Sequence, residues 1–383
     1  MRFILVMTTA LLVGVSLPLG AQGAPKDIAA KEQQPAPKYN IEFTEGEPVA
    51  GIGAIHAFSM PLECSSDGTL FVNTVQSLDA GRLPANLAPF QQSMLMISVS
   101  PTNEAHSFPL NNIPDLSDIR EVAEYPTDSS IVFLLNAASE DKKEKRTYIG
   151  SDGQPNETTV NSAPHHFFLV LFERDGRYSK TIPIEDSFQI TRIGMFPDGM
   201  YLAYGYDNTD HSPKLALLKE DGTLLKYLEA PKGGIPESAV LQSKNSLGFF
   251  VSPTQFAGQA HSIYLLQNKT DSPILEVTES GALRVIKPKL RDGLKIDMLI
   301  PSDQNLYGRM SDPKDGSIFE FDENNGDVLK RFDAKKDQSG TDIACVHDNK
   351  FLSFKQVQGK LIPLSGTAVP ASDNGSLNKS DSQ

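Results

Sequence analysis

The feature that most constrains the fold of this chain is one sequence register that recurs six times. Each copy has an apolar residue, two spacers, a turn position that is Asp in five copies and Lys244 in the fourth, and then a β-rich run. The copies begin at Cys64, Tyr125, Met195, Leu241, Ile300 and Cys345. A strand, an Asp, Asn or Gly turn and a second strand form a β-hairpin. The register therefore predicts an all-β repeat protein.

A second hairpin follows several of the copies, most clearly over residues 167–178 around the turn Asp175-Gly176. It recurs over residues 215–225, 274–285 and 318–328. Two hairpins per copy give four-stranded units, which are typical of the blades of a propeller. The sixth copy runs out at Leu364, whereas residues 39–43 form a strand-like segment that belongs to no copy. We expect this N-terminal strand to complete the last unit and close the ring.

In this register the chain resembles the six-bladed β-propellers of the NHL and TolB-like kind over about residues 39–364. The resemblance implies a ring of six four-stranded antiparallel blades and says almost nothing about activity. Two alternatives remain, a pair of β-sandwiches and a seven-bladed ring.

The first 23 residues have the pattern of a signal peptide. Arg2 provides the positive charge, an apolar stretch follows, and Ala21-Gln22-Gly23 provides a small-x-small cleavage site. A membrane anchor is the competing interpretation, but polar residues and Pro18 interrupt the stretch. Cleavage predicts a periplasmic or extracellular protein without membrane insertion. The expected order is then a flexible linker over 24–38, the propeller domain over 39–365 and a disordered tail over 366–383.

The formal net charge of -13 argues against nucleic acid as a partner, because nucleic acid carries charge of the same sign. The remaining expectation is a protein or small-molecule ligand. The longest insertions, at 74–92, 136–164, 205–213 and 252–261, should all fall on one face of the ring. Long loops on a rigid scaffold commonly bind ligands. Within them, the mixed-charge run 140–146 predicts a solvated loop, with a docking element as the alternative.

Four residues are weak candidates for binding a ligand or partner: His165, Asp207, Asp210 and His211. The last three form the richest cluster of oxygen and imidazole groups, but they lack the spacing of a calcium loop, and a turn rich in Asp and Asn explains them equally well. His165 and His166 are adjacent on an expected strand and should point to opposite faces, which makes them poor ligands for one metal. No cofactor is predicted.

Cys64 and Cys345 are the only cysteines, and they occupy the same register position in the first and last copies. Those copies become neighbours in a closed ring, so a disulfide could lock the closure. A disulfide needs Cα atoms within about 7 Å, which only positions near the axis of the ring satisfy. Two buried thiols are the equal alternative.

No catalytic constellation is evident in the sequence, which has no Gly-x-Ser-x-Gly elbow and no phosphate-binding glycine loop. We therefore expect a non-enzymatic scaffold that binds on its loop-rich face. The alternative is a metal-dependent hydrolase or lyase with a divalent cation at the central channel. Glu45-Gly-Glu-Pro48 is faintly similar to the early glutamate motif of propeller lactonases, but the aromatic-rich strand that should follow is missing.

Overall fold

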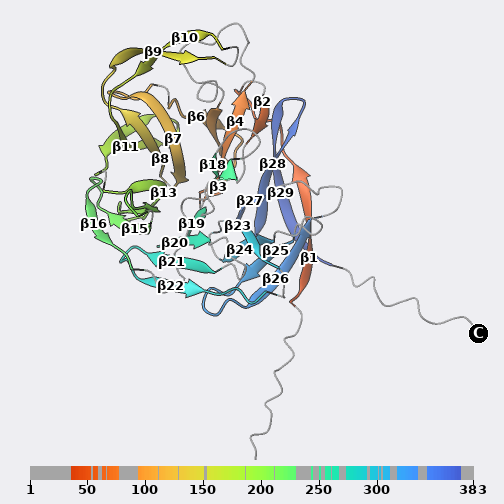
Figure 1. Cartoon of the computed structure of the whole chain (residues 1–383). Coiled ribbons are helices and arrows are strands. Elements are labelled where there is room, and N and C mark those ends of the chain that lie inside the picture. The colour runs from red at the N-terminus through yellow and green to blue at the C-terminus, as the bar shows by residue number, and fades with distance from the viewer. Residues whose placement is uncertain are drawn as a thin grey trace, which may run out of the picture. The chain divides into compact units, whose positions relative to one another are not determined.

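The computed structural model is all-β (Figure 1), and no helix occurs among the residues it describes. It describes residues 36–371 except 53–54, 59–62, 66, 77–93, 111, 128, 151–152, 186, 211, 230–242, 245–249, 252–254, 260, 267–272, 291–293, 301, 303–304, 311–316 and 335–342. The expected signal peptide lies outside these residues, as do most of the linker and positions 372–383. Within the described part, no helix is long and apolar enough to cross a membrane.

The first three large sheets follow one another along the chain. Sheet B contains β2 (Ile55–Phe58), β3 (Glu63–Cys64), β4 (Leu70–Gln76), β5 (Met94–Val99) and β6 (Ala105–Ser107). Sheet C contains β7 (Ser117–Pro126), β8 (Ser130–Ala138), β11 (His165–Glu173) and β12 (Tyr178–Pro183). Sheet E contains β13 (Gln189–Met195), β14 (Tyr201–Tyr206), β15 (Pro213–Leu218) and β16 (Leu224–Tyr227).

Two further large sheets follow, and the second is twice the size of the first. Sheet G contains β19 (Gln255–Gln259), β20 (Ser262–Leu266), β21 (Ile274–Thr278) and β22 (Leu283–Ile286). Sheet A contains β23 (Ile296–Ile300), β24 (Leu306–Met310), β25 (Ile318–Phe321), β26 (Val328–Ala334), β1 (Lys38–Glu45), β29 (Lys360–Pro370), β28 (Lys350–Val357) and β27 (Ile343–His347). Two small hairpins stand apart, β9 (Lys143–Ile149) with β10 (Pro155–Asn161), and β17 (Ser243–Lys244) with β18 (Phe250–Val251).

Apolar side chains pack between the sheets in a cyclic order. One cluster joins sheet B to sheet C, where Phe108, Phe133 and Phe172 lie with ring centroids 5.7–5.9 Å apart. A second joins C, E and G, and a third joins G to β23–β26. The fourth joins the two halves of sheet A, and the fifth returns from β27–β29 to sheet B. The packing therefore closes on itself.

The N-terminal strand lies between the two halves of sheet A. The expectation that residues 39–43 pair with the last unit is confirmed, because β1 runs antiparallel to β29 from Tyr39 opposite Pro370 to Glu45 opposite Leu364. The sequence did not predict the second pairing of β1, which runs parallel to β26. This pairing merges two neighbouring units into one eight-stranded sheet. β29 also continues to Pro370, past the expected start of the tail at 366.

Five of the six register copies have a strand on each side of the expected turn. The fourth copy was assigned wrongly. Of its residues the structure describes only Ser243 and Lys244, which form β17 and pair with β18, whereas the four-stranded sheet G begins at β19. The expected insertion at 252–261 therefore contains β19 instead of a loop. The register missed β19 because its sequence, Gln255-Phe-Ala-Gly-Gln259, is typical of a loop.

Candidate functional site

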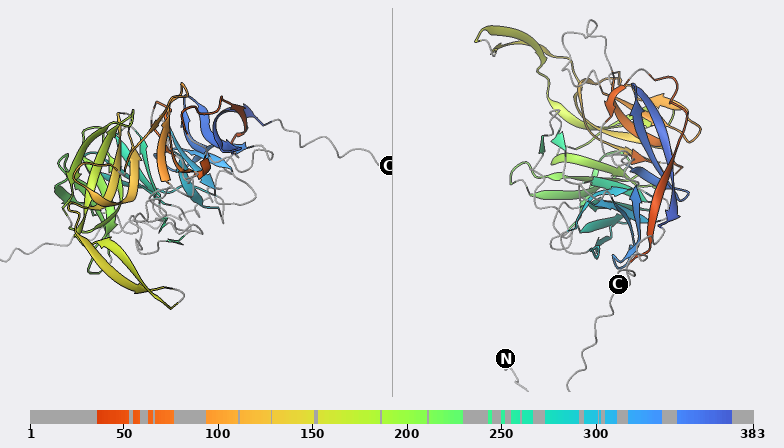
Figure 2. Two further views of the ribbon diagram at one scale, coloured as in Figure 1. Left: turned by 90° about the horizontal axis from the view of Figure 1, so that it is seen from above. Right: turned by 90° about the vertical axis from the view of Figure 1, so that its right-hand side faces the viewer.

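The most exposed element of the described chain is the β9–β10 hairpin, which we call the arm. It is inserted between β8 and β11, and Figure 2 shows it extending away from the sheets in both views. Every side chain of β9 is exposed, and β10 is exposed over its first five residues. The two strands pair only with each other, from Lys143 opposite Asn161 to Ile149 opposite Pro155.

The arm corrects the expectation of a solvated loop at 140–146. Thr147, Ile149 and Val160 have branched β-carbons, which favour an extended backbone over a coil. The turn is closed by backbone hydrogen bonds from Gly150 N–H to the Gln154 carbonyl (2.8 Å) and from Gly153 N–H to the Gly150 carbonyl (3.0 Å). Gly153 has a φ of 74°, a conformation that few residues with a side chain adopt. The segment is solvated as expected, but it is a ribbon.

The tip of the arm carries two apolar side chains. Tyr148 is 52% exposed and Ile149 is 69% exposed, the largest values among the exposed large hydrophobic residues of the described chain. Neighbouring residues of a strand point to opposite faces, so the tip is apolar on both sides of the ribbon. Along the shaft, the three basic residues Lys143, Lys145 and Arg146 form exposed ion pairs with Asp141, Glu157 and Glu144.

Asn161 holds the base of the arm. Its side-chain oxygen accepts hydrogen bonds from the backbone N–H groups of Lys142 and Ala163, both at 3.0 Å. Its amide nitrogen donates to the Glu140 carbonyl at 2.8 Å and to the Ser117 hydroxyl at 3.0 Å. An asparagine amide has two donor hydrogens and two acceptor lone pairs, so the whole capacity of this side chain is used.

The candidate His165 lies next to this base and forms a polar contact with sheet C's first strand. Its Nε2 lies 2.9 Å from the Asp118 carboxylate, which also accepts from Arg120 Nη2 at 3.2 Å. Asp118 has a φ of 46°, in the left-handed region that aspartate tolerates better than most residues. The neighbouring Ser117 hydroxyl donates to the Glu140 carbonyl at 2.8 Å. Ser117 therefore belongs to the hydrogen bonds at the base of the arm, next to the contact between His165 and Asp118.

Asp207 and Asp210 lie in the connection between β14 and β15, and His211 lies outside the described residues. Each carboxylate accepts a hydrogen bond from a backbone N–H two residues ahead, Thr209 at 2.7 Å for Asp207 and Ser212 at 2.8 Å for Asp210. The bond from Thr209 lowers the pKa of Asp207, and bonds from Ser212 lower the pKa of Asp210. This geometry is the Asx turn that the sequence offered as the alternative to a binding loop.

Cys64 and Cys345 form a disulfide with their Cα atoms 6.0 Å apart. It connects β3 of sheet B to β27 of sheet A across 281 residues of sequence. Cys345 is fully buried among the cluster that joins these two sheets. The bond therefore joins the edge strand β27 of sheet A to sheet B, whereas β1 joins β26 to β29 within sheet A.

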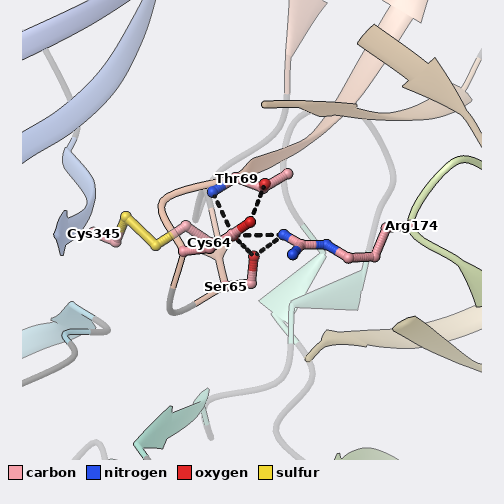
Figure 3. Close-up of a disulfide and its surroundings, with 6 residues drawn as sticks. Cys64, Ser65, Thr69, Arg174 and Cys345 are labelled. Carbon is pink, nitrogen blue, oxygen red and sulfur yellow. Dashed lines mark hydrogen bonds and ion pairs between the residues drawn. A yellow bond between two sulfur atoms is a disulfide. The ribbon is translucent and has the colours of Figure 1, made fainter. Parts of the chain in front are cut away.

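A polar network lies beside the disulfide and reaches sheet C (Figure 3). One Asp67 carboxylate oxygen accepts from the Ser65 hydroxyl at 2.8 Å and from the Thr69 N–H at 3.0 Å. The same oxygen accepts from Arg174 Nη2 at 2.5 Å, and that nitrogen also donates to Ser65 Oγ at 2.7 Å. Partial burial alone would raise the pKa of Asp67, but the hydrogen bonds from Arg174, Thr69 and Ser65 outweigh it and hold the pKa well below its usual range.

Asp67→Asn is expected to lower stability at neutral pH by up to about 1 kcal/mol, because a partly exposed ion pair is screened by solvent. A depressed carboxylate pKa stabilises the fold at pH values above the unfolded value of 3.8, and this contribution is lost as the pH falls below it. The difference between Asp67→Asn and the parent chain should therefore shrink between pH 5 and pH 2. Urea unfolding across this range measures it. A difference that is constant with pH would contradict the assignment.

Glu121 and Glu124 on β7 are a second pair of interest, since their carboxyl groups share a hydrogen bond. Glu121 is exposed and Glu124 is half-buried. Local desolvation, followed by the negative charge of Glu124, raises the pKa of Glu121 above its usual range. Nothing in the local sequence indicates this pair. Over the described part of the chain, no group of three or more His, Cys, Asp or Glu side chains is arranged to hold a metal ion.

Comparisons with known proteins give no family. No family model matches the chain, and no curated protein matches it. Among solved structures it is similar to a subtype N11 neuraminidase-like protein (flat-faced bat, H18N11), with a TM-score of 0.42 and 12% identity, covering 88% of this chain and 96% of that one. It is also similar to a Myxococcus xanthus glutaminyl cyclase, with a TM-score of 0.32, 10% identity and coverage of 88% and 100%.

A third similar structure is described as YCF48 bound to D1 peptide, with a TM-score of 0.36, 9% identity and coverage of 87% and 97%. The proteins named in these structures differ in activity. Similarity at this level assigns no function to the chain.

Proposed function

We propose that this chain is an exported, six-bladed β-propeller scaffold without catalytic activity, and that it recruits a protein partner through the arm. The closed order of sheets supports six blades if the two halves of sheet A are counted separately. The signal-peptide pattern of residues 1–23 supports export to the periplasm or the cell exterior. The function itself depends on one observation, an ordered ribbon that is fixed at its base and buries nothing along its length.

An isolated two-stranded hairpin is only marginally stable in water. A ribbon that extends away from its sheets keeps its open edges and its apolar tip exposed to solvent. Burying Tyr148 and Ile149 against a partner would contribute roughly 2–4 kcal/mol. That is enough for a few side chains to dominate an interface, as aromatic anchors commonly do.

A protein is a better partner for the arm than an anionic surface. The chain as a whole carries a net charge of -13, which disfavours approach to nucleic acid or to acidic lipid. The arm itself, over residues 143–161, carries three basic and three acidic residues. It is therefore close to neutral and offers no positive patch to an anionic surface.

Photo-crosslinking in the native cell tests this function. A benzophenone amino acid replaces Tyr148 in one variant and Leu225 in another, since Leu225 of β16 is 45% exposed and lies on a different sheet. The Tyr148 position should form one discrete protein adduct, and the Leu225 position should not. Equal labelling at both positions, or none at Tyr148, would rule out recruitment through the arm.

A further inference from the structure

We infer that the arm is a rigid probe for a narrow apolar cleft of a folded partner protein, and that Asn161 is the positioning residue that fixes its direction. This inference rests on the proposed function and specifies its partner. It depends on the hydrogen bonds at the base of the arm and on the distribution of side chains at its tip.

The hydrogen bonds of Asn161 connect the ends of several strands to one side chain. Ser117 begins β7, Glu140 follows β8, and Lys142 precedes β9. All three contact Asn161, which is itself the last residue of β10. The Ser162 N–H and hydroxyl add two bonds to the Lys142 carbonyl, at 2.8 and 3.1 Å. Both strands of the arm are therefore connected to sheet C through one set of hydrogen bonds centred on Asn161.

Such a junction matters for binding because order that already exists in the free protein does not have to be created in the complex. A ribbon without it would sample many directions, and only a fraction would present the tip correctly. The apparent affinity falls by that fraction. A preorganised arm therefore suits a partner whose binding site is itself preformed.

The shape of the tip indicates the shape of that site. Ile149 lies opposite Pro155 on one face of the ribbon, and Tyr148 lies opposite Asn156 on the other. A flat protein surface or a membrane that receives one face of the ribbon broadside would leave the other face exposed. A cleft contacts both faces at once.

The rigidity of the arm can be measured without the partner. Nitroxide labels are placed at Thr147→Cys in β9 and Leu225→Cys in β16, and pulsed electron resonance gives the distribution of distances between them. We expect one narrow distribution for the parent chain, a clearly broader one for Asn161→Ala and an intermediate one for Asn161→Asp, which retains only the acceptor oxygen. Asn156→Ala is the matched control at the other end of β10 and should keep the distribution narrow.

Thermal unfolding of the Asn161 variants is the control for folding. The transition should be unchanged, because the arm lies outside sheet C and its loss of order leaves that sheet intact. If Asn161→Ala unfolds the chain, the milder Asn161→Asp variant still reports the broadening. A parent distribution as broad as that of the Asn161 variants would overturn the positioning role. Crosslinking at Tyr148 could still succeed in that case, so the proposed function would survive.

The cleft is tested by placing the crosslinking residue at Tyr148 and at Ile149 in turn. Both positions should yield the same adduct, and Asn161→Ala should reduce both yields on the order of five-fold or more. An adduct from only one position would contradict binding in a cleft and would indicate that the partner contacts the arm with a flat surface. Vesicles of phosphatidylglycerol and phosphatidylcholine are the probe for a membrane, and flotation of the protein that depends on Tyr148 and Ile149 would also overturn it.

Discussion

Deletion of Lys38–Glu45 is expected to abolish cooperative unfolding of the chain. The deletion removes the hydrogen-bonded pairing of β1 with both β26 and β29. It also removes Ile41, which is fully buried between the halves of sheet A. Loss of one buried Ile side chain alone costs about 2–5 kcal/mol. The typical stability of a domain is only about 5–15 kcal/mol, so loss of a whole strand should leave little of it.

Circular dichroism during heating, combined with size-exclusion chromatography, measures this outcome. The deleted chain should lack a sharp transition and should associate, because two sheet edges become exposed. Deletion of residues 24–35 is the control and should leave the transition unchanged. A deleted chain that melts like the parent would show that β1 does not close the fold.

A matched pair of glycine substitutions tests the same strand with less disruption. A Cβ at Gly366 would lie 2.6 Å from Ile41 Cγ2 and 2.8 Å from Phe43 Cε1, whereas a Cβ at Gly46 would meet only ordinary contacts, the nearest at 3.5 Å. Gly366→Ala should therefore cost about 1–3 kcal/mol through overpacking, and Gly46→Ala much less. Equal effects would place β1 at a different distance from β29.

Replacement of both cysteines, as Cys64→Ala with Cys345→Ala, is expected to lower the free energy of unfolding by about 5 kcal/mol, because a cross-link over this length of chain restricts the unfolded state. The separation of 281 residues makes the closed loop nearly as long as the described chain. Urea unfolding of the oxidised parent and of the variant gives the difference.

The parent chain unfolded in the presence of a thiol reductant should reproduce most of the loss. The double variant should be insensitive to the same reductant, which controls for effects of the reagent elsewhere. A difference below about 1 kcal/mol would mean that β1 and the apolar cluster already close the ring without the bond.

The sequence predicted the parts of the fold that repeat. A polar turn residue followed by a β-rich run recurs at Asp67, Asp198 and Asp348, and such local patterns identify hairpins without knowledge of the rest of the chain. The N-terminal strand was also predictable, because the last unit lacked one strand and residues 39–43 had no other partner.

Features that depend on distant residues were not predictable. The parallel pairing of β1 with β26 joins Tyr39 to Phe332, and nothing local in either strand distinguishes this edge from any other. The fourth unit was misassigned because β19, Gln255-Phe-Ala-Gly-Gln259, is short, polar and rich in small residues. Its sequence is typical of a loop, and only its position in sheet G makes it a strand.

The candidate site was located only in part. The insertion at 136–164 was expected to contact solvent on the loop-rich face, and the arm arises from it. Asn161 gave no signal, because a single asparagine in a polar stretch is indistinguishable from many others. The contact of Asp67 with Arg174 spans 107 positions and was equally invisible. Contacts between side chains that are far apart in sequence can be identified only from the structure.

The double pairing of β1 also determines when the molecule can be completed. The strand is among the first parts of the domain to be synthesised, yet its partners at 331–334 and 364–370 are among the last. Until they exist, Ile41 and Phe43 have nowhere to be buried. Contacts of such long range form slowly. Folding can therefore be completed only after β29 has been synthesised, and a chain that stops growing before β29 leaves β1 unburied.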